Sequence, residues 1–376
     1  MFREAVFTLA GTVIGAGIFA LPYFVARLGL GAALALLAAA ILVNVWLSLA
    51  YLRVFLDTGA ASLEDSAERL MGRAGLLAAH AVKMLTVTLV MYIYVSGVSS
   101  MLTSLLRGVG IHAPPEWLTR LAVAASTALI VAARPSGYAR LVSSMTEWLV
   151  ALMLLVSVAS LLSPRGACGA PAPSYSLLAA WGPALFSSMD ALTMPNIYHI
   201  LGDEASTRRA VVGAYGLVAI VYAFFMASVL YALDSRVADI VVKSLYCLAP
   251  LGSRLLGYAL YAIGSIVVLL AMLTSLYNFG YLAGFTLEER WGLSRRGASL
   301  ATLALLAPSA LLPRSFALVM HVLSTIAMTL MVSLIIVLHV AAEARRGRLN
   351  AAKLLADALI LASVAAGAST LLSTGR

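Results

Sequence analysis

The stretch AGTVIGAGIFALP, residues 10–22, places three glycines and a proline inside an otherwise apolar N-terminal segment. Glycine destabilises a helix interior by about 1 kcal/mol and proline by about 3 kcal/mol relative to alanine. Gly11, Gly15, Gly17 and Pro22 therefore weaken a single apolar helix near its middle. Either the helix is broken there and exposes backbone groups, or the spacing of Gly11 and Gly15 serves close helix packing.

The composition of the chain requires a lipid environment. Of its 376 residues, 62% are hydrophobic and only 11% are charged, and the mean hydropathy is +0.99. Folding in water does not hide so much apolar surface, which excludes a soluble globular protein. The net charge of +9 is spread in short clusters between apolar runs, a pattern that indicates membrane orientation rather than nucleic-acid binding. The N-terminus lacks a signal-peptide cleavage pattern, so we expect residues 5–28 to be retained as a first span.

Apolar runs of about 20 residues predict an all-α integral membrane protein with about eleven spans. The predicted spans are residues 5–28, 30–55, 75–106, 118–134, 138–163, 179–201, 209–233, 253–287, 297–313, 315–340 and 353–373. Most Lys and Arg residues fall on the side of the N-terminus, which predicts a multi-pass plasma-membrane protein with a cytoplasmic N-terminus and an outer C-terminus. Between two spans, residues 62–73 predict a short amphipathic cytoplasmic helix that is capped by Ser62, with Asp65 at N3.

A second interruption lies in the sixth predicted span, within LFSSMDALTMP at residues 185–195. Both spans carry small or polar residues seven and five positions before a proline: Gly15 and Gly17 before Pro22, Ser188 and Asp190 before Pro195. The first and sixth spans each begin a group of five, and because five is odd, the two groups enter the membrane from opposite sides. Paired broken helices in inverted halves point to the binding site of a secondary transporter.

The stretch at residues 10–22 resembles the first-helix signature of the tryptophan/tyrosine permeases, a branch of the amino acid–polyamine–organocation (APC) superfamily. The segments LGDEASTRRAVVGAYG (201–216) and MLTSLYNFGYLAGFTLEER (272–290) are similar to the family in pattern. The resemblance implies a LeuT-type fold of two inverted five-helix repeats with discontinuous helices 1 and 6. The expected parts are the first repeat (1–163), an outer loop (164–178), the second repeat (179–340), and a basic cytoplasmic loop with helix 11 (341–376).

The resemblance also implies a substrate site between the two broken helices. Backbone N–H groups after the helix 1 break would bind the substrate carboxylate, carbonyls of both breaks would bind its amino group, and helix 3 would cover it. A zwitterion suits this arrangement, because a helix N-terminus favours an anion and unpaired carbonyls favour a cation. The residues implied are Thr12, Gly15, Ala16, Gly17, Ile18, Tyr92, Tyr94, Ser96, Phe186, Ser187, Ser188 and Asp190.

Sodium and a proton are the two coupling ions that we consider. In sodium symporters of this fold, carbonyls of helix 1 and a carbonyl with two hydroxyls of helix 8 hold the ion. The matching residues here are Gly11, Ile14, Ala271, Thr274 and Ser275. Alternatively, the Thr274 and Ser275 hydroxyls hydrogen-bond to their own helix.

Proton coupling requires an ionisable group within the spans. The candidates are Asp190, Glu147 and Lys83. Asp190 has the best position, at a point where the family is usually less acidic. For Lys83 and Glu147 the alternative is a structural ion pair, or a side chain that reaches back to the membrane surface.

No other cofactor and no metal is expected, because none of the five histidines has a second histidine or a cysteine at helical spacing. His321, with Ser324 and Thr325, either lines the permeation path or makes hydrogen bonds between helices. Cys168 and Cys247 fall in predicted outer loops and are either bridged or two unrelated small residues.

Two other function classes are disfavoured. An integral-membrane enzyme needs a catalytic constellation near the membrane surface, and a channel needs a filter loop or a charged ring; neither motif is present. We therefore expect a cation-coupled amino acid symporter, for aromatic or other neutral substrates, that works by alternating access. An uncoupled exchanger or facilitator is the alternative. The expected partners are a small amino acid and the lipid bilayer, and not nucleic acid.

Overall fold

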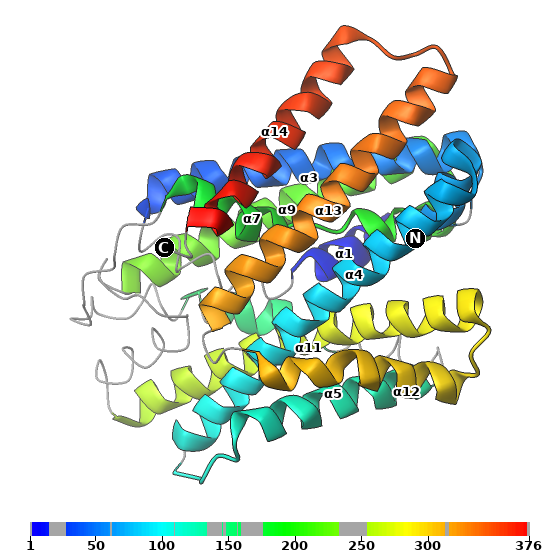
Figure 1. The fold of residues 1–376 in the computed structure, drawn as a ribbon. Helices are drawn as coiled ribbons and strands as arrows, with labels where there is room; N and C mark the ends of the chain where they lie inside the picture. The colour runs from blue at the N-terminus through cyan, green and yellow to red at the C-terminus, as the bar shows by residue number, and fades with distance from the viewer. Residues whose placement is uncertain are drawn as a thin grey trace.

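The computed structural model describes residues 2–14, 28–60, 62–108, 110–133, 145, 148–155, 157–158, 176–232, 254–312 and 316–373. Within these residues all regular elements are helical (Figure 1). The elements are α1 (Phe2–Val13), α3 (Leu30–Thr58), α4 (Leu63–Gly108), α5 (Glu116–Ala132), α7 (Leu177–Ser187), η1 (Ala191–Thr193), α8 (Met194–Leu201), α9 (Glu204–Ala232), α11 (Arg254–Trp291), α12 (Arg295–Leu306), η2 (Ala307–Leu311), α13 (Phe316–Arg345) and α14 (Ala351–Ser373).

Six helices of the described chain are long and apolar enough to cross a membrane. These are Leu30–Thr58, Leu63–Arg107, Glu204–Ser228, Ser265–Trp291, Leu318–Arg345 and Ala351–Leu371. The predicted count of about eleven is not confirmed, because α5 and α12 have only 17 and 12 residues and the sixth predicted span is interrupted. The first and fifth predicted spans continue into residues outside the described part. The inverted five-helix repeats stay a prediction.

The long helix α4 runs diagonally through the molecule, as Figure 1 shows, and lies between two groups of helices. On one side, α5, α11 and α12 pack against one another and against α4. On the other side, α1, α3, α7, α8 and α9 form the second group, and α13 contacts α3, α4 and α7. α14 packs outside α7 and α13. This second group contains the end of α1 and the predicted break in the sixth span, whereas Gly15 and Gly17 of the first predicted break lie outside the described residues.

The predicted short helix at residues 62–73 forms the first part of α4. The Asp65 N–H donates to Ser62 Oγ at 3.1 Å, which confirms the predicted cap. Gly72 has φ 70° and ψ −161°, a conformation that only glycine adopts readily, and it separates this short helix from the span that follows. Arg290, at the end of α11, donates to Ser62 Oγ at 3.0 Å and to Asp65. The short helix is therefore held against α11.

Two glycines of α11 allow it to approach α5 closely. A Cβ atom at Gly280 would lie 2.5 Å from Thr127 Cγ2, and one at Gly284 would lie 2.3 Å from Val131 Cγ1. Small residues four positions apart let two membrane helices bring their backbones together. This contact joins α5 and α11 into one unit.

Candidate functional site

The interruption that was predicted in the sixth span is present between α7 and α8. α7 ends at Ser187, and Ser188 (φ −127°, ψ 10°) and Asp190 (φ −153°, ψ 41°) leave the helical conformation. α8 begins at Met194 after one 3₁₀ turn, with Pro195 in its first turn, where the missing N–H removes no helical hydrogen bond. The Leu185 and Phe186 carbonyls accept hydrogen bonds from the N–H groups of Ser188 and Met189, which directly follow α7, and the Leu185 and Ser187 carbonyls also accept from other helices.

The end of α1 lies beside the end of α7. Tyr222 on α9 is fully buried, and its hydroxyl lies 3.0 Å from the Val13 carbonyl oxygen and 2.8 Å from the Ser187 carbonyl oxygen. One hydroxyl thus contacts the last helical residue of α1 and of α7. The predicted carboxylate contacts Ala16, Gly17 and Ile18, and the predicted site residue Gly15, fall outside the described residues and stay predictions.

Asp190 is a buried carboxylate between these two helix ends. Its side chain accepts hydrogen bonds from the Thr12 hydroxyl of α1 and from Thr193 Oγ1 at 2.8 Å. Thr12 Oγ1 also lies 2.8 Å from the Leu9 carbonyl oxygen. Within the described residues, Asp190 has no ion-pair partner. The structure therefore brings together Thr12 and Asp190, two of the residues predicted for the site.

A buried amide supports the break from α3. Asn44 Nδ2 donates to the Leu185 carbonyl oxygen at 2.9 Å and to Ser188 Oγ at 2.8 Å. One turn further along α3, the Ser48 and Tyr215 hydroxyls lie 3.1 Å apart. Sequence reasoning missed Asn44 and Tyr222. An isolated amide inside the apolar run at residues 30–55 was a signal for Asn44, but Tyr222 carried none.

Helix 3 of the prediction corresponds to α4, and its three candidates lie in different environments. The Tyr94 ring packs 5.9 Å from Phe186 and 6.1 Å from Phe279, between centroids, which places aromatic rings beside the break. Ser96 is fully buried, and its hydroxyl has no hydrogen-bond partner in the described part of the chain. Tyr92 instead donates its hydroxyl to the Leu305 carbonyl oxygen of α12 at 2.8 Å. The structure does not bring Tyr92 to the Asp190 cluster.

The residues predicted for sodium lie on α1 and α11, which contact each other. Gly11, Ile14 and Ala271 are buried. Thr274 Oγ1 donates to the Ala271 carbonyl oxygen at 3.0 Å, which is the alternative of bonding within the helix. The buried Ser275 hydroxyl has no partner among the described residues. These residues also contain no group of three or more His, Cys, Asp and Glu side chains that could hold a metal ion.

Lys83 is bound in a buried ion pair, away from the break. Its ammonium lies 2.8 Å and 3.1 Å from the two carboxylate oxygens of Glu64, a fully buried residue. His80 Nδ1 lies 3.8 Å from the same carboxylate, and its Nε2 accepts from Trp291 at 3.0 Å. This geometry matches the structural alternative for Lys83. Glu147, Cys168 and Cys247 lie outside the described residues.

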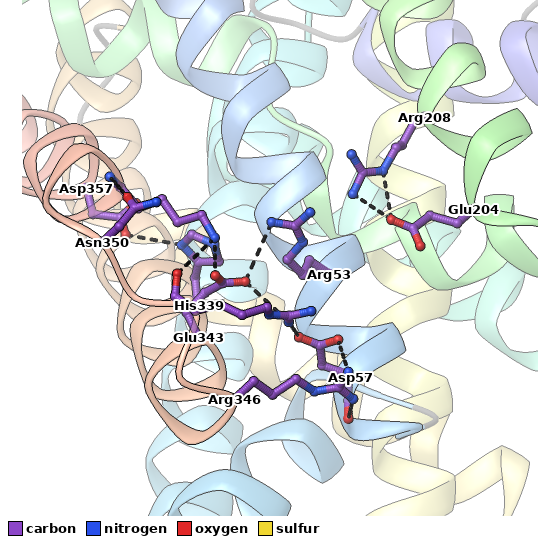
Figure 2. A network of polar contacts seen from close by, with 11 residues as sticks. Arg53, Asp57, Glu204, Arg208, His339, Glu343, Arg346, Asn350 and Asp357 are labelled. Atoms are coloured by element: carbon purple, nitrogen blue, oxygen red, sulfur yellow. Dashed lines mark hydrogen bonds and ion pairs between the residues drawn. The ribbon is translucent and has the colours of Figure 1, made fainter.

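A second polar cluster joins α3, α13 and α14, and Figure 2 shows its members. Glu343, fully buried, lies 3.6 Å from Arg53 and 3.4 Å from Arg348, and it accepts from Lys353. Nearby, His339 Nδ1 lies 3.1 Å from Asp357. These charges pair with one another and fix α14 to the rest of the bundle. We call this set the α13–α14 network.

The predicted group around His321 lies where α13 meets α7. Thr325 Oγ1 donates to the His321 carbonyl oxygen at 2.7 Å, and the buried Ser324 hydroxyl has no partner in the described residues. A Cβ atom at Gly182 would lie 2.3 Å from Thr325 Oγ1. The first half of the broken helix therefore rests directly on α13.

Comparison with known proteins gives a family and a fold. The model of the tryptophan/tyrosine permease family matches residues 2–243. The crystal structure of MhsT in complex with L-phenylalanine, a LeuT-fold transporter, is similar at a TM-score of 0.64 and 15% identity, over 99% of this chain and 98% of that chain. No curated protein matches the chain. At this identity, the similarity to MhsT shows a shared fold.

Proposed function

The chain belongs to the tryptophan/tyrosine permease family, and on that premise we propose that it moves an aromatic or other neutral amino acid together with a cation, by alternating access. Family membership makes it a membrane-embedded amino acid transporter and not an enzyme. We further propose that it resides in the plasma membrane with its N-terminus in the cytoplasm.

The observation that carries the proposal is the buried Asp190 carboxylate between the ends of α1 and α7. A charge buried away from water is costly unless it is paired or neutralised. Thr12 and Thr193 supply hydroxyls but no positive charge. The ammonium group of an amino acid, or a proton, would supply what is lacking. The rings of Tyr94, Phe186 and Phe279 support an aromatic or large apolar substrate side chain.

We propose the proton as the coupling ion. The Asp190 carboxylate, buried between the ends of α1 and α7, can bind and release a proton within the site. Thr274 donates its hydroxyl proton to the Ala271 carbonyl of the same helix, but its oxygen keeps lone pairs that can bind sodium. The sodium arrangement at Gly11, Ile14, Ala271, Thr274 and Ser275 is therefore the alternative that the experiment distinguishes.

The test is uptake of labelled amino acids into proteoliposomes that contain the purified protein. Sodium and pH gradients are imposed separately, and the labelled set includes phenylalanine, tyrosine, tryptophan, leucine, alanine and lysine. We expect saturable uptake of an aromatic amino acid that needs an inward proton gradient and stops when a protonophore is added. Uptake that follows the sodium gradient instead would overturn proton coupling and favour the α1–α11 site. Absence of saturable uptake and exchange for every amino acid would overturn the transport proposal.

A further inference from the structure

We propose that Tyr222 is a positioning residue that holds the carbonyl ends of α1 and α7 at a fixed separation and thereby sets the affinity for the amino group of the substrate. This inference rests on the proposed transport of amino acids. It concerns a residue that lies on α9, on neither of the broken helices.

Two helix C-termini that approach each other need a hydrogen-bond donor between them. The last carbonyls of a helix lack intrahelical partners and carry the negative end of the helix dipole. At the ends of α1 and α7, these groups repel each other and are removed from water. A carbonyl that is buried without a donor destabilises the fold by about 1–3 kcal/mol. The Tyr222 hydroxyl, which lies within 3.0 Å of both the Val13 and Ser187 oxygens, is such a donor.

The Tyr222 side chain is suited to hold a fixed position. Its exposed fraction is 0%, and the neighbouring Val218, Phe225 and Met226 on α9 are equally buried. A tyrosine has only two side-chain torsions that set the place of its ring, so a packed ring defines where the hydroxyl lies. Because α9 packs against α1, α3 and α8, it can fix both helix ends relative to one scaffold.

The single proton of the hydroxyl indicates which ligand completes the arrangement. A phenol donates to one acceptor at a time, whereas Val13 and Ser187 present two carbonyl oxygens. The oxygen that does not receive the proton can accept a further hydrogen bond. The protonated amine of an amino acid carries several donors, and we assign it to this position.

Tyr215 provides a matched control on the same helix. It precedes Tyr222 by two helical turns, so both rings leave the same face of α9. Its exposed fraction is 1%, and its hydroxyl lies 3.1 Å from the Ser48 hydroxyl and beside the Asp190 backbone, so it contacts the break after α7. Tyr222→Phe and Tyr215→Phe each remove one buried hydroxyl and leave the ring in place. Any general effect of losing a buried hydroxyl therefore appears in both variants.

The experiment measures the Kd of a labelled amino acid for the wild type and both variants in detergent, together with their thermal unfolding. Hydrogen–deuterium exchange of the segments 9–14 and 185–194 is followed in the absence of substrate. We expect Tyr222→Phe to raise the Kd about tenfold and to accelerate exchange in both segments. Tyr215→Phe should raise the Kd less than Tyr222→Phe and leave exchange in the segment 9–14 unchanged, while the two variants unfold at similar temperatures.

The outcomes separate this inference from the proposed function. Equal Kd values for the two variants, or unchanged exchange at the two segments in Tyr222→Phe, would overturn the positioning role. Failure of the wild type to bind any amino acid would overturn the proposed function, whereas the exchange measurement would still test the link between the helix ends. If Tyr222→Phe does not fold, hydrogen–deuterium exchange of the wild-type protein is measured instead, with and without substrate. Bound substrate should then slow both segments together, and slowing of one alone contradicts the proposal.

Discussion

Asp190 and Glu343 are both buried carboxylates in a membrane protein, but their surroundings differ. Glu343 lies among Arg53, Arg348 and Lys353, so its charge is fully compensated (Figure 2). Asp190 receives hydrogen bonds only from threonine hydroxyls in the described residues. Burial of an ionised group is tolerated when cations pair with it, and it is otherwise a sign of function. On the proposed function, the charges of the α13–α14 network stabilise the fold, whereas Asp190 binds the amino group of the substrate or a proton.

The largest effect should follow from Asp190→Asn. The amide oxygen still accepts from the threonine hydroxyls, so the free energy of unfolding should change by less than about 1 kcal/mol. Loss of the negative charge should lower uptake about 100-fold and remove its dependence on the proton gradient. Proteoliposome uptake and thermal unfolding in detergent measure the two effects. Normal, proton-driven uptake in this variant would remove the distinction between the two carboxylates.

Glu343→Gln should produce the opposite pattern. Removing the shared carboxylate takes this ion-pair partner from Arg53 and Lys353, whereas Arg348 keeps its pair with Asp57. The side chains of the three cations are 22–39% exposed and regain hydration. We therefore expect a loss of about 1–3 kcal/mol in the free energy of unfolding, below the cost of breaking a fully buried pair. Uptake for each folded molecule should stay within twofold of the wild type. A selective loss of uptake with unchanged unfolding would assign the α13–α14 network to transport.

The smallest effect should come from Glu204→Gln, which calibrates the other two variants. Glu204 and Arg208 form a pair one helical turn apart on α9, and their side chains are 49% and 40% exposed. Water and salt screen such a pair, so its loss should lower the free energy of unfolding by about 0.3–0.5 kcal/mol. Unfolding measured at low and high salt checks this value. A loss above 1 kcal/mol would show that exposed pairs here behave like the buried ones.

Local patterns in the sequence predicted the features of the fold and of the site that depend on nearby residues. The interruption before Pro195 and the Ser62 cap were both readable, because each depends on residues within one or two turns. The contacts that support the break were not. Tyr222 and Asn44 reach partners 209 and 141 positions away, and no spacing rule relates such distant positions. Lys83 likewise binds Glu64, which lies outside the predicted spans, so the sequence analysis did not pair the two residues.

The two tyrosines of α4 show why one predicted site residue, Tyr92, lies away from the break. Residues two positions apart on a helix point about 200° away from each other. Tyr92 and Tyr94 therefore cannot both face the break. Tyr94 lies beside Phe186, and Tyr92 binds the Leu305 carbonyl on the other side. Helical periodicity alone would have limited the candidates to one of the pair.

The contact between Gly182 and Thr325 bears on how readily the first half of the broken helix can shift. Because Gly182 has no side chain, it offers Thr325 van der Waals contact but no side-chain hydrogen bond. Such forces fade within an ångström of separation, so a small tilt of α7 releases the contact without stranding a polar group. A larger side chain at position 182 would overlap Thr325, and on the proposed alternating-access mechanism it would hinder a tilt of α7 against α13.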